Sequence, residues 1–162
     1  MKQIISKNLL MTIKRQKKRM SNDENKVTLK EVIKSDSRFL YNLLKQRDPR
    51  VNISHKKIPT YAQHVKFILS KPYLGWYTIR LKNKKVGSVY LSQQNEIGIF
   101  TDKQFQNKGI GNTALKLIIK KHPLPRYLAN INPKNKNSIK FFKKNNFKLI
   151  QYTYELIPSD VN

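Results

Sequence analysis

The sequence predicts a mixed α/β domain built around a central, largely antiparallel sheet. Segments in which apolar and polar residues alternate are interleaved with segments in which apolar residues recur at helical spacing. Three consecutive predicted strands are also joined by short connections, which is typical of antiparallel neighbours. The chain of 162 residues has the length of one domain, expected over residues 26–157, with residues 1–25 as an arm and 158–162 as a tail.

The individual elements follow from these two periodicities. Strands are expected where apolar and polar residues alternate, in residues 26–33, 76–81, 86–91, 96–100, 127–131, 147–150 and 152–156. Helices are expected where a capping residue precedes apolar residues at helical spacing, after Asp36, after Thr60, from Gly109 to before Pro123, and from Asn135 or Asn137 to Asn145. Asn83-Lys84 is expected to form a hairpin turn.

The composition excludes several classes of site. The chain has no cysteine, so a disulfide framework, a thiol nucleophile and a cysteine zinc site are excluded, and no metal is expected. No apolar run approaches the roughly 20 residues of a membrane span, and a cytoplasmic setting is expected. The formal net charge of +25 indicates either a preference for polyanions such as nucleic acid or a compositional bias toward lysine, asparagine and isoleucine.

The arm contains a run of basic residues, from Lys14 to Arg19. Such a run is typical of a disordered, solvated segment, or of a nucleic-acid patch. The functional domain is expected to begin near Lys26.

Two glycines lie between the strand at 96–100 and the helix that follows. Gly109 and Gly111 are two of only five glycines in the chain. A glycine-rich turn at a helix N-terminus lets successive backbone N–H groups approach a phosphate, and the helix dipole favours the same anion. The spacing fits neither of the two best-known phosphate loops, because G-x-x-x-x-G-K-[ST] and a third glycine for G-x-G-x-x-G are both missing.

A longer pattern resembles one family. Gln106-Asn107-Lys108-Gly109-Ile110-Gly111 resembles Q/R-x-x-G-x-G/A, the acetyl-coenzyme A signature of the GNAT N-acetyltransferases. The strand Ile97–Asp102 before it, and the downstream pattern Asn135-x-x-Ser138-x-x-x-Phe142-x-x-x-Asn146-Phe147, are similar to that family as well. The resemblance implies a GNAT-like fold with about four flanking helices and a splayed strand pair that holds acetyl-CoA.

The resemblance also implies which residues bind acetyl-CoA. The loop and helix start would hold the pyrophosphate through Gln106, Asn107, Lys108, Gly109, Ile110, Gly111 and Asn112. Pantetheine would lie between the strand edge at Ile99, Phe100 and Thr101 and the residues Asn132 and Asn135 across the gap. The backbone N–H of Phe100 would stabilise the oxyanion.

The catalytic groups are less well defined. The position that often holds a proton-donating tyrosine in the family is Phe142, so a water molecule or the hydroxyl of Tyr152, Tyr154 or Tyr90 would have to donate the proton. These tyrosines could instead be packing residues. A protein that binds acyl-coenzyme A without activity is a further alternative. Glu96 is the candidate general base or a glutamate paired with a lysine. His64 and His55 are its rivals, and His64 could equally be a packing residue.

The acceptor region shows a looser resemblance. The segment from Arg47 to His64 and Trp76 are similar to amino-sugar-nucleotide N-acetyltransferases of the pseudaminic-acid type. Arg47, Arg50, Lys56 and Lys57 would pair with a pyrophosphate, Tyr61 or Trp76 would stack on a base or sugar, and His55 would line the site. The expected function is direct transfer of an acetyl group to a primary amine of such an acceptor in a ternary complex. The alternatives are acetylation of a protein N-terminus, as on ribosomal proteins, and a basic nucleic-acid-binding protein; a homodimer is also possible.

Overall fold

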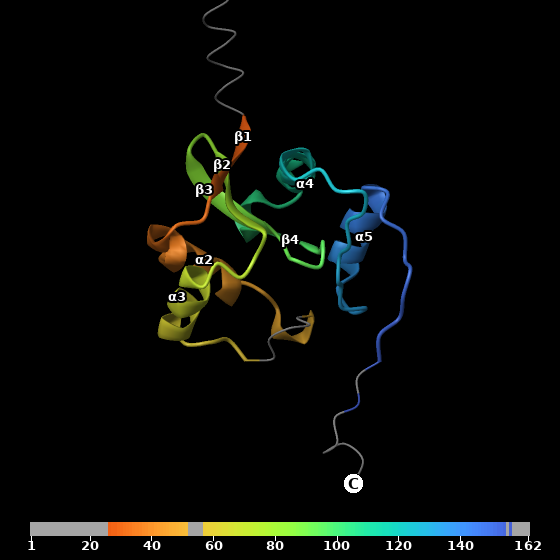
Figure 1. The fold of residues 1–162 in the computed structure, drawn as a ribbon, viewed down its shortest axis with the longest axis horizontal. Coiled ribbons are helices and arrows are strands. Elements are labelled where there is room, and N and C mark those ends of the chain that lie inside the picture. Colours follow the sequence, from red (N-terminus) through yellow and green to blue (C-terminus); the bar gives the residue numbers. More distant parts are fainter. Residues whose placement is uncertain (1–25, 52–56, 155, 157–162) are drawn as a thin grey trace, which may run out of the picture.

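The computed structural model describes residues 26–51, 57–154 and 156 of the chain. The predicted arm (1–25), the predicted tail (158–162), His55 and Lys56 lie outside the described residues. Within the described part, the elements follow the predicted order from the first strand to the last helix, except that the strand expected at residues 127–131 is not formed (Figure 1). No helix in this part of the chain is long and apolar enough to span a membrane.

The sheet consists of β1 (Val27–Glu31), β2 (Gly75–Leu81), β3 (Lys84–Leu91) and β4 (Ile97–Thr101). They lie in the order β1-β2-β3-β4, and each neighbouring pair is antiparallel, as predicted. The hairpin between β2 and β3 turns at Lys82 and Asn83, whose φ angles are 49° and 62°. Two central residues with positive φ are typical of a type I′ turn, so the turn lies one residue before the predicted position.

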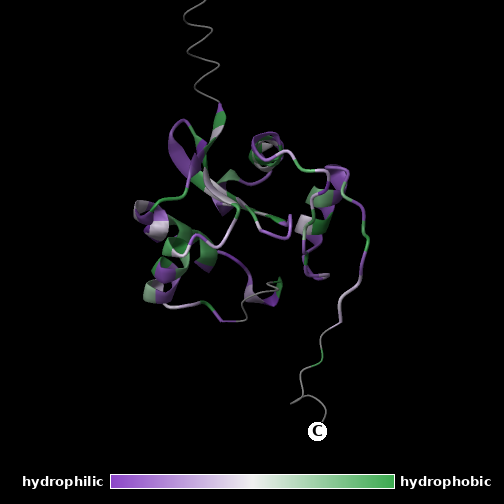
Figure 2. Cartoon of the chain, viewed as in Figure 1, coloured by the Kyte–Doolittle hydropathy of each residue, from purple (hydrophilic) through white to green (hydrophobic). Residues whose placement is uncertain are grey.

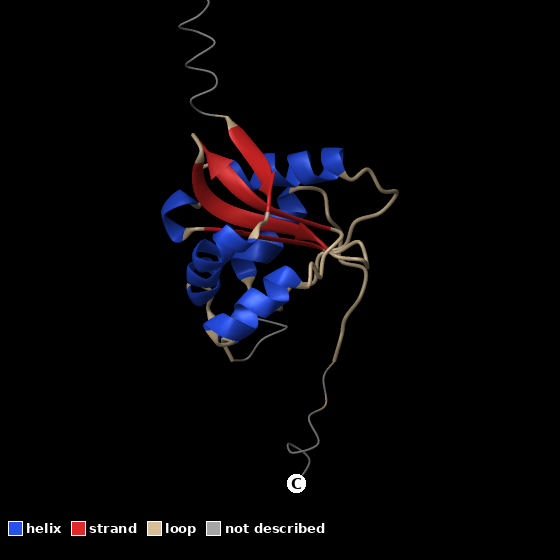
Figure 3. Ribbon diagram, turned by 60° about the vertical axis from the view of Figure 1, so that its left-hand side comes forward, coloured by secondary structure: helices blue, strands red, loops and turns tan. Residues whose placement is uncertain are grey.

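Four longer helices flank the sheet within the described residues: α2 (Ser37–Lys45), α3 (Tyr61–Leu69), α4 (Ile110–Lys121) and α5 (Lys136–Lys144). Short 3₁₀ turns lie at Lys34–Asp36 before α2, at Pro49–Val51 after α2, and at Lys103–Phe105 before the glycine loop, which consists of residues 106–111. Helix α4 covers one face of the sheet, whereas α2 and α3 lie on the other (Figures 1 and 3). Thr60 caps α3 as predicted, with its side chain accepting from the Gln63 N–H.

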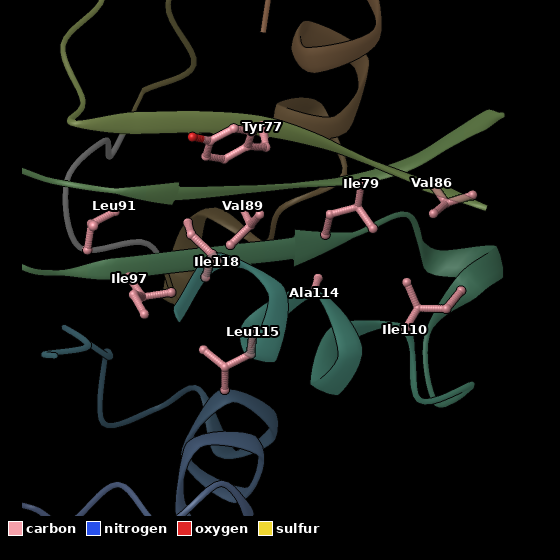
Figure 4. Close-up of a cluster of buried hydrophobic side chains, with 10 residues drawn as sticks. All are labelled: Tyr77, Ile79, Val86, Val89, Leu91, Ile97, Ile110, Ala114, Leu115 and Ile118. Atoms are coloured by element: carbon pink, nitrogen blue, oxygen red, sulfur yellow. The ribbon is translucent and has the colours of Figure 1, made fainter. Parts of the chain in front are cut away.

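The main core lies between α4 and the sheet face that it covers. Every second residue of β2 points to this face, and β3 and β4 present residues in the same register. Figure 4 shows these side chains meeting those of α4, and Figure 2 shows that the polar residues gather instead at the hairpin tip and on outer helix faces. The buried set is Tyr77, Ile79, Val86, Val89, Leu91, Ile97, Ile110, Ala114, Leu115 and Ile118.

A buried carboxylate links the sheet to α2. Asp36 has a 1% exposed side chain and lies 2.5 Å from the ammonium of Lys85 and 4.0 Å from the guanidinium of Arg80. Its other oxygen accepts a hydrogen bond from the Ile33 N–H at 2.9 Å. Asp36 therefore occupies the predicted N-cap position of α2, but its side chain binds the two cations and the preceding turn, not a helix amide.

The last predicted strands are corrected by the structure. Residues 127–131 form a single bridge to the sheet, at Leu128, and no strand is formed within residues 147–154. Leu149 and Ile150, on which the strand prediction depended, are 66% and 64% exposed. A strand needs a continuous backbone edge to pair with, and alternation of apolar residues alone does not supply one.

Candidate active site

The site begins where β4 and the segment after α4 separate. The two meet at one parallel bridge, in which the Ile97 N–H donates to the Leu128 carbonyl at 2.8 Å and the Leu128 N–H donates to the Asn95 carbonyl at 2.9 Å. Beyond this bridge, no further pairing joins β4 to residues 129–132. The free edge of β4 therefore faces a gap, which is the splayed pair that the resemblance implied.

The bridge determines which β4 amides face the gap. In an antiparallel pair, successive residues of a strand direct their N–H and C=O groups to opposite sides. Since the Ile97 N–H bonds to Leu128, the N–H groups of Ile99 and Thr101 also point away from β3. The N–H of Phe100, which is opposite Ser88, points toward β3. This corrects the expectation that the Phe100 amide is the oxyanion donor. The N–H groups of β4 that face the gap beyond the bridge are those of Ile99 and Thr101.

A cavity of about 220 Å³ lies along this open edge. It receives residues from β3 and β4, from the segment after α4, from α5, and from the turn after α2. The lining residues are Arg47, Asp48, Val51, Tyr90, Glu96, Ile97, Gly98, Ile99, Phe100, Asn130, Ile131, Asn132, Asn135, Ser138 and Phe142. Sequence-distant residues predicted to bind cofactor, act as base and bind acceptor thus share one cavity.

The glycine loop presents unpaired amides at the start of α4. Gly109 is the N-cap, has a φ of 75°, and accepts the first intrahelical bond from the Thr113 N–H at 3.1 Å. The amides of residues 110–112 therefore lack an intrahelical carbonyl. Asn107, with a φ of 60°, makes the turn before them. Free N–H groups and the helix dipole at one point favour a bound phosphate.

Four other residues of the loop and of the first turn of α4 have distinct roles. The Gln106 side chain donates to the Thr101 carbonyl at 3.1 Å, which ties the loop to the end of β4. Lys108 lines a second cavity of about 300 Å³ beside Gly109, so its charge is close to the free amides. A Cβ on Gly111 would lie 3.1 Å from the Phe141 ring, so this glycine permits close packing of α5 on α4. The Asn112 side chain accepts a hydrogen bond from Asn145, also of the α5 end.

The candidate base and the residues across the gap are held by hydrogen bonds. The Glu96 carboxylate accepts from the Asn130 side chain at 2.6 Å, which fixes it at the cavity wall. Asn132 donates to the Arg50 carbonyl at 3.4 Å and joins this wall to the turn after α2. The Asn135 side chain accepts from the Ser138 N–H at 3.0 Å, so it caps α5 as predicted.

The structure brings Tyr90 into the site, and not Tyr152 or Tyr154. Tyr152 and Tyr154 are 75% and 93% exposed, because the strands expected to carry them are not formed, and neither lines the cavity. Tyr90 does, and its ring crosses Gly98 on β4, where a Cβ would lie 2.1 Å from the ring. Tyr90 is opposite Gly98 on the next strand, and the missing side chain of this glycine leaves room for the ring.

Tyr90 is protonated at neutral pH in this environment. Burial raises its pKa above the ordinary value, and the nearby Glu96 carboxylate raises it further, although Arg47 has the opposite effect. Its ring stacks on Tyr73 with centroids 4.1 Å apart. Phe142, which is 6% exposed, faces the same cavity with a ring that has no proton to donate. Within the described residues, Tyr90 is the tyrosine that lines this cavity.

His64 lies outside the cavity, in the packing between α2 and α3. Its ring is 6% exposed and 5.4 Å from the Tyr41 ring, measured between centroids. Burial lowers the pKa of His64 below its ordinary value of 6.5, and a hydrogen bond with the backbone of Ser37 opposes this shift only in part. The position supports the packing alternative for this residue and not that of general base.

This pKa shift predicts a pH dependence of stability. The unfolded chain binds a proton at His64 near pH 6.5 more readily than the folded one does, so the stabilisation is fully present above about pH 6.5 and is lost as the pH falls through the lowered folded value. We expect His64→Leu to reduce the fall in melting temperature between pH 7.5 and 5. Equal falls in the two proteins, measured by circular dichroism, would assign the pH dependence to other groups.

The predicted acceptor residues separate into two groups. Arg47 lines the cavity, with its guanidinium carbon 5.3 Å from the Phe100 ring centroid. Arg50 has an 84% exposed side chain and forms an ion pair with Asp48 at 2.8 Å. Tyr61 packs against Tyr41 and Arg38, and Trp76 donates to the Ser88 hydroxyl at 2.8 Å, so both serve the packing behind the cavity.

Comparisons with known proteins agree with this geometry. The sequence profile of the acetyltransferase (GNAT) domain matches residues 26–148. A domain from Methanocaldococcus jannaschii has a similar structure, with 25% identity and a TM-score of 0.69, over 81% of this chain and 94% of that one. A search of the curated proteins gave no match.

Two named enzymes share the fold at lower identity. The ribosomal L7/L12 alpha-N-protein acetyltransferase in complex with coenzyme A is 17% identical, with a TM-score of 0.62, over 77% of this chain and 81% of that one. The spermidine/spermine N-acetyltransferase of Vibrio cholerae is 16% identical, with a TM-score of 0.59, over 73% and 77%.

The family match covers most of the chain and includes both parts of the site. It spans the glycine loop before α4 and the open edge of β4, which the structure places beside one cavity. The fold of the similar structures is the same mixed α/β arrangement. The chain therefore belongs to the GNAT family of acetyltransferases and is an acetyl-CoA-dependent N-acetyltransferase.

Proposed function

We propose that the protein acetylates the primary amine of an amino sugar or a nucleotide-linked amino sugar. The observation that carries the proposal is the cavity beside the open edge of β4, which contains both a carboxylate, Glu96, and a guanidinium, Arg47. The first can accept the proton of an attacking amine, and the second can bind an anionic group of the same molecule. The sequence resemblance around Arg47 favours a sugar nucleotide.

The cofactor fits two features of the chain. The free amides at residues 110–112, with Lys108 beside them, would hold the pyrophosphate. The backbone of Ile99 and the N–H of Thr101 on the open edge of β4 would hold pantetheine on one side, with Asn132 on the other. When bound there, acetyl-CoA supplies the acetyl group as a thioester.

Three residues of the cavity would carry out the transfer. Glu96 accepts the proton of the attacking amine, directly or through water, while Asn130 holds its carboxylate in place. The Ile99 N–H donates to the carbonyl oxygen as negative charge develops there. Tyr90, kept protonated by burial, donates its proton to the departing thiolate. Phe142 contributes only an apolar wall.

Glu96→Gln tests the role of the base. Glutamine keeps the shape and the ability to accept from Asn130, but it cannot take a proton. We expect kcat/KM to fall by about 10²- to 10⁴-fold, while acetyl-CoA still raises the melting temperature as in the parent protein. Unchanged kcat/KM in a thiol-release assay would remove Glu96 from the mechanism.

A second candidate acceptor is a protein N-terminus. It is favoured by the similarity of the fold to the ribosomal L7/L12 alpha-N-protein acetyltransferase. Thiol release from acetyl-CoA, measured across amino sugars, their nucleotide conjugates, polyamines and peptides, separates the candidates. We expect turnover with the sugar compounds, and a response to peptides alone would favour this second candidate.

Other expectations stay predictions. The cytoplasmic setting, the homodimer and the role of the basic arm are compatible with the proposed function, and none of them is needed by it.

A further inference from the structure

Arg47 is a partly buried cation that forms no ion pair within the described residues. It follows the end of α2, and its guanidinium lies over the Phe100 ring. Its Nε is buried and makes no hydrogen bond within the described residues. The ion pairs of this part of the chain use Asp36 and Asp48, and Arg47 belongs to neither.

The neighbouring acid does not neutralise this charge. Asp48, the next residue, is held by Arg50, whose Nε and Nη2 donate to both carboxylate oxygens at 2.8 to 3.2 Å. Arg50 thus occupies Asp48 and, being 84% exposed, is neutralised at the surface. Burying an unpaired charge is costly, so a position that keeps one is a candidate for binding a group of opposite charge.

Aromatic residues flank the guanidinium of Arg47. Tyr73 and Tyr90 stack on each other beside it, and Phe100 lies beneath it at 5.3 Å from centroid to guanidinium carbon. A guanidinium stacked on rings keeps its edge N–H groups in a fixed fork, which matches the two oxygens of a carboxylate or phosphate. Arg47 is therefore arranged to bind an oxyanion.

The size of the cavity limits where that oxyanion can be. Arg47 and Glu96 line the same space of about 220 Å³, which the reacting end of the cofactor must also enter. An acceptor whose amine reaches Glu96 has little room left, so its negative group must lie within a few bonds' reach of the cavity. Lysine side chains and polyamines carry no such group.

We propose that Arg47 selects acceptors that carry an oxyanion, a carboxylate or a phosphate, close to the reacting amine. This rests on the proposed function, and it excludes polyamines and basic peptides as the natural acceptors. Arg47 acts as a specificity-determining residue that contacts the acceptor, while Arg50 at the rim does not.

The test compares Arg47→Met, Arg47→Lys and Arg126→Met in the full chain. Methionine fills the apolar space without charge, lysine keeps the charge without the fork, and Arg126→Met, at an exposed arginine that does not line the cavity, is the matched control. The acceptors are a neutral amino sugar, its phosphate, its nucleotide conjugate, a small amino acid and spermidine. Binding of each is measured by calorimetry with coenzyme A present, which requires no turnover, and kcat/KM by thiol release.

We expect Arg47→Met to weaken binding and kcat/KM by about 10- to 100-fold for the acceptors that the parent protein prefers, and Arg47→Lys to restore part of the loss. Whichever of the phosphate, the nucleotide and the amino acid shows this loss identifies the source of the oxyanion. Arg126→Met should behave as the parent. The melting temperature of Arg47→Met without ligands should equal or exceed that of the parent, because a partly buried charge that has no ion pair within the described residues is removed.

Three results would overturn the inference. The first is equal binding of anionic acceptors by the parent protein and Arg47→Met. The second is a preference of the parent protein for spermidine. The third is loss of the acetyl-CoA-induced rise in melting temperature in Arg47→Met, which would assign Arg47 to the cofactor. Arg47-dependent binding of an anionic amine without any acetyl transfer would support the inference while contradicting the proposed function.

Discussion

Replacing Gly109 with valine is expected to abolish the rise in melting temperature that acetyl-CoA produces. Gly109 is the N-cap of α4 with a φ of 75°, a region that β-branched residues avoid. Valine would shift the backbone to negative φ and rotate the amides of residues 110–112 away from a common point. Saturating ligand stabilises a protein by about 2.7 kcal/mol at one hundred times its Kd, so the loss is readily measured by thermal shift.

Gly109→Asn is the matched control for backbone conformation. Asparagine tolerates positive φ, and a Cβ at this position has no atom within 4 Å, so the folded chain can accept it. We expect Gly109→Asn to keep the loop geometry and more of the cofactor response than valine does. A normal acetyl-CoA response in Gly109→Val would show that these amides do not hold the cofactor.

Replacing Tyr90 with phenylalanine is expected to lower kcat by about 10²- to 10⁴-fold, the usual contribution of a general acid. The ring remains, so its stacking on Tyr73 at 4.1 Å and its packing across Gly98 are preserved. Only the hydroxyl, whose pKa is raised by burial, is lost. The acetyl-CoA response in a thermal-shift assay should therefore be unchanged.

A second variant makes this test specific. Phe142 faces the same cavity, so Phe142→Tyr places a hydroxyl at another point of the wall. We expect Phe142→Tyr to recover part of the kcat of Tyr90→Phe, and to change the parent protein only slightly. Full activity of Tyr90→Phe alone would instead favour water as the proton donor.

The fold could be predicted where local periodicity and pairing agree. The alternation of β2 and β3 with a short turn between them, and the cap at Thr60, contain their own structural information. The segment from Phe147 to Tyr154 has similar alternation, but its strand would depend on an edge elsewhere in the chain. Residues 127–131 pair only at Leu128, so that edge is not present.

The site was predictable in outline for the same reason. The loop from Gln106 to Gly111 is a local motif, and in the structure it ends at the N-cap of α4. The direction of a β4 amide depends on register, which the bridge of Ile97 to Leu128 determines, so the choice of Phe100 over Ile99 could not be made from sequence. The presence of Tyr90 beside Arg47 likewise depends on how α2 packs on the sheet.

Residue-resolved amide hydrogen exchange with and without acetyl-CoA tests the central claim most directly. That claim is that the open edge of β4 binds the cofactor through the Ile99 N–H. We predict that the Ile99 amide exchanges rapidly in the free protein and becomes protected when acetyl-CoA binds, while the Phe100 amide, directed toward β3, is protected in both states. An Ile99 amide whose exchange is unaffected by acetyl-CoA, or a Phe100 amide that becomes protected only on binding, would contradict it.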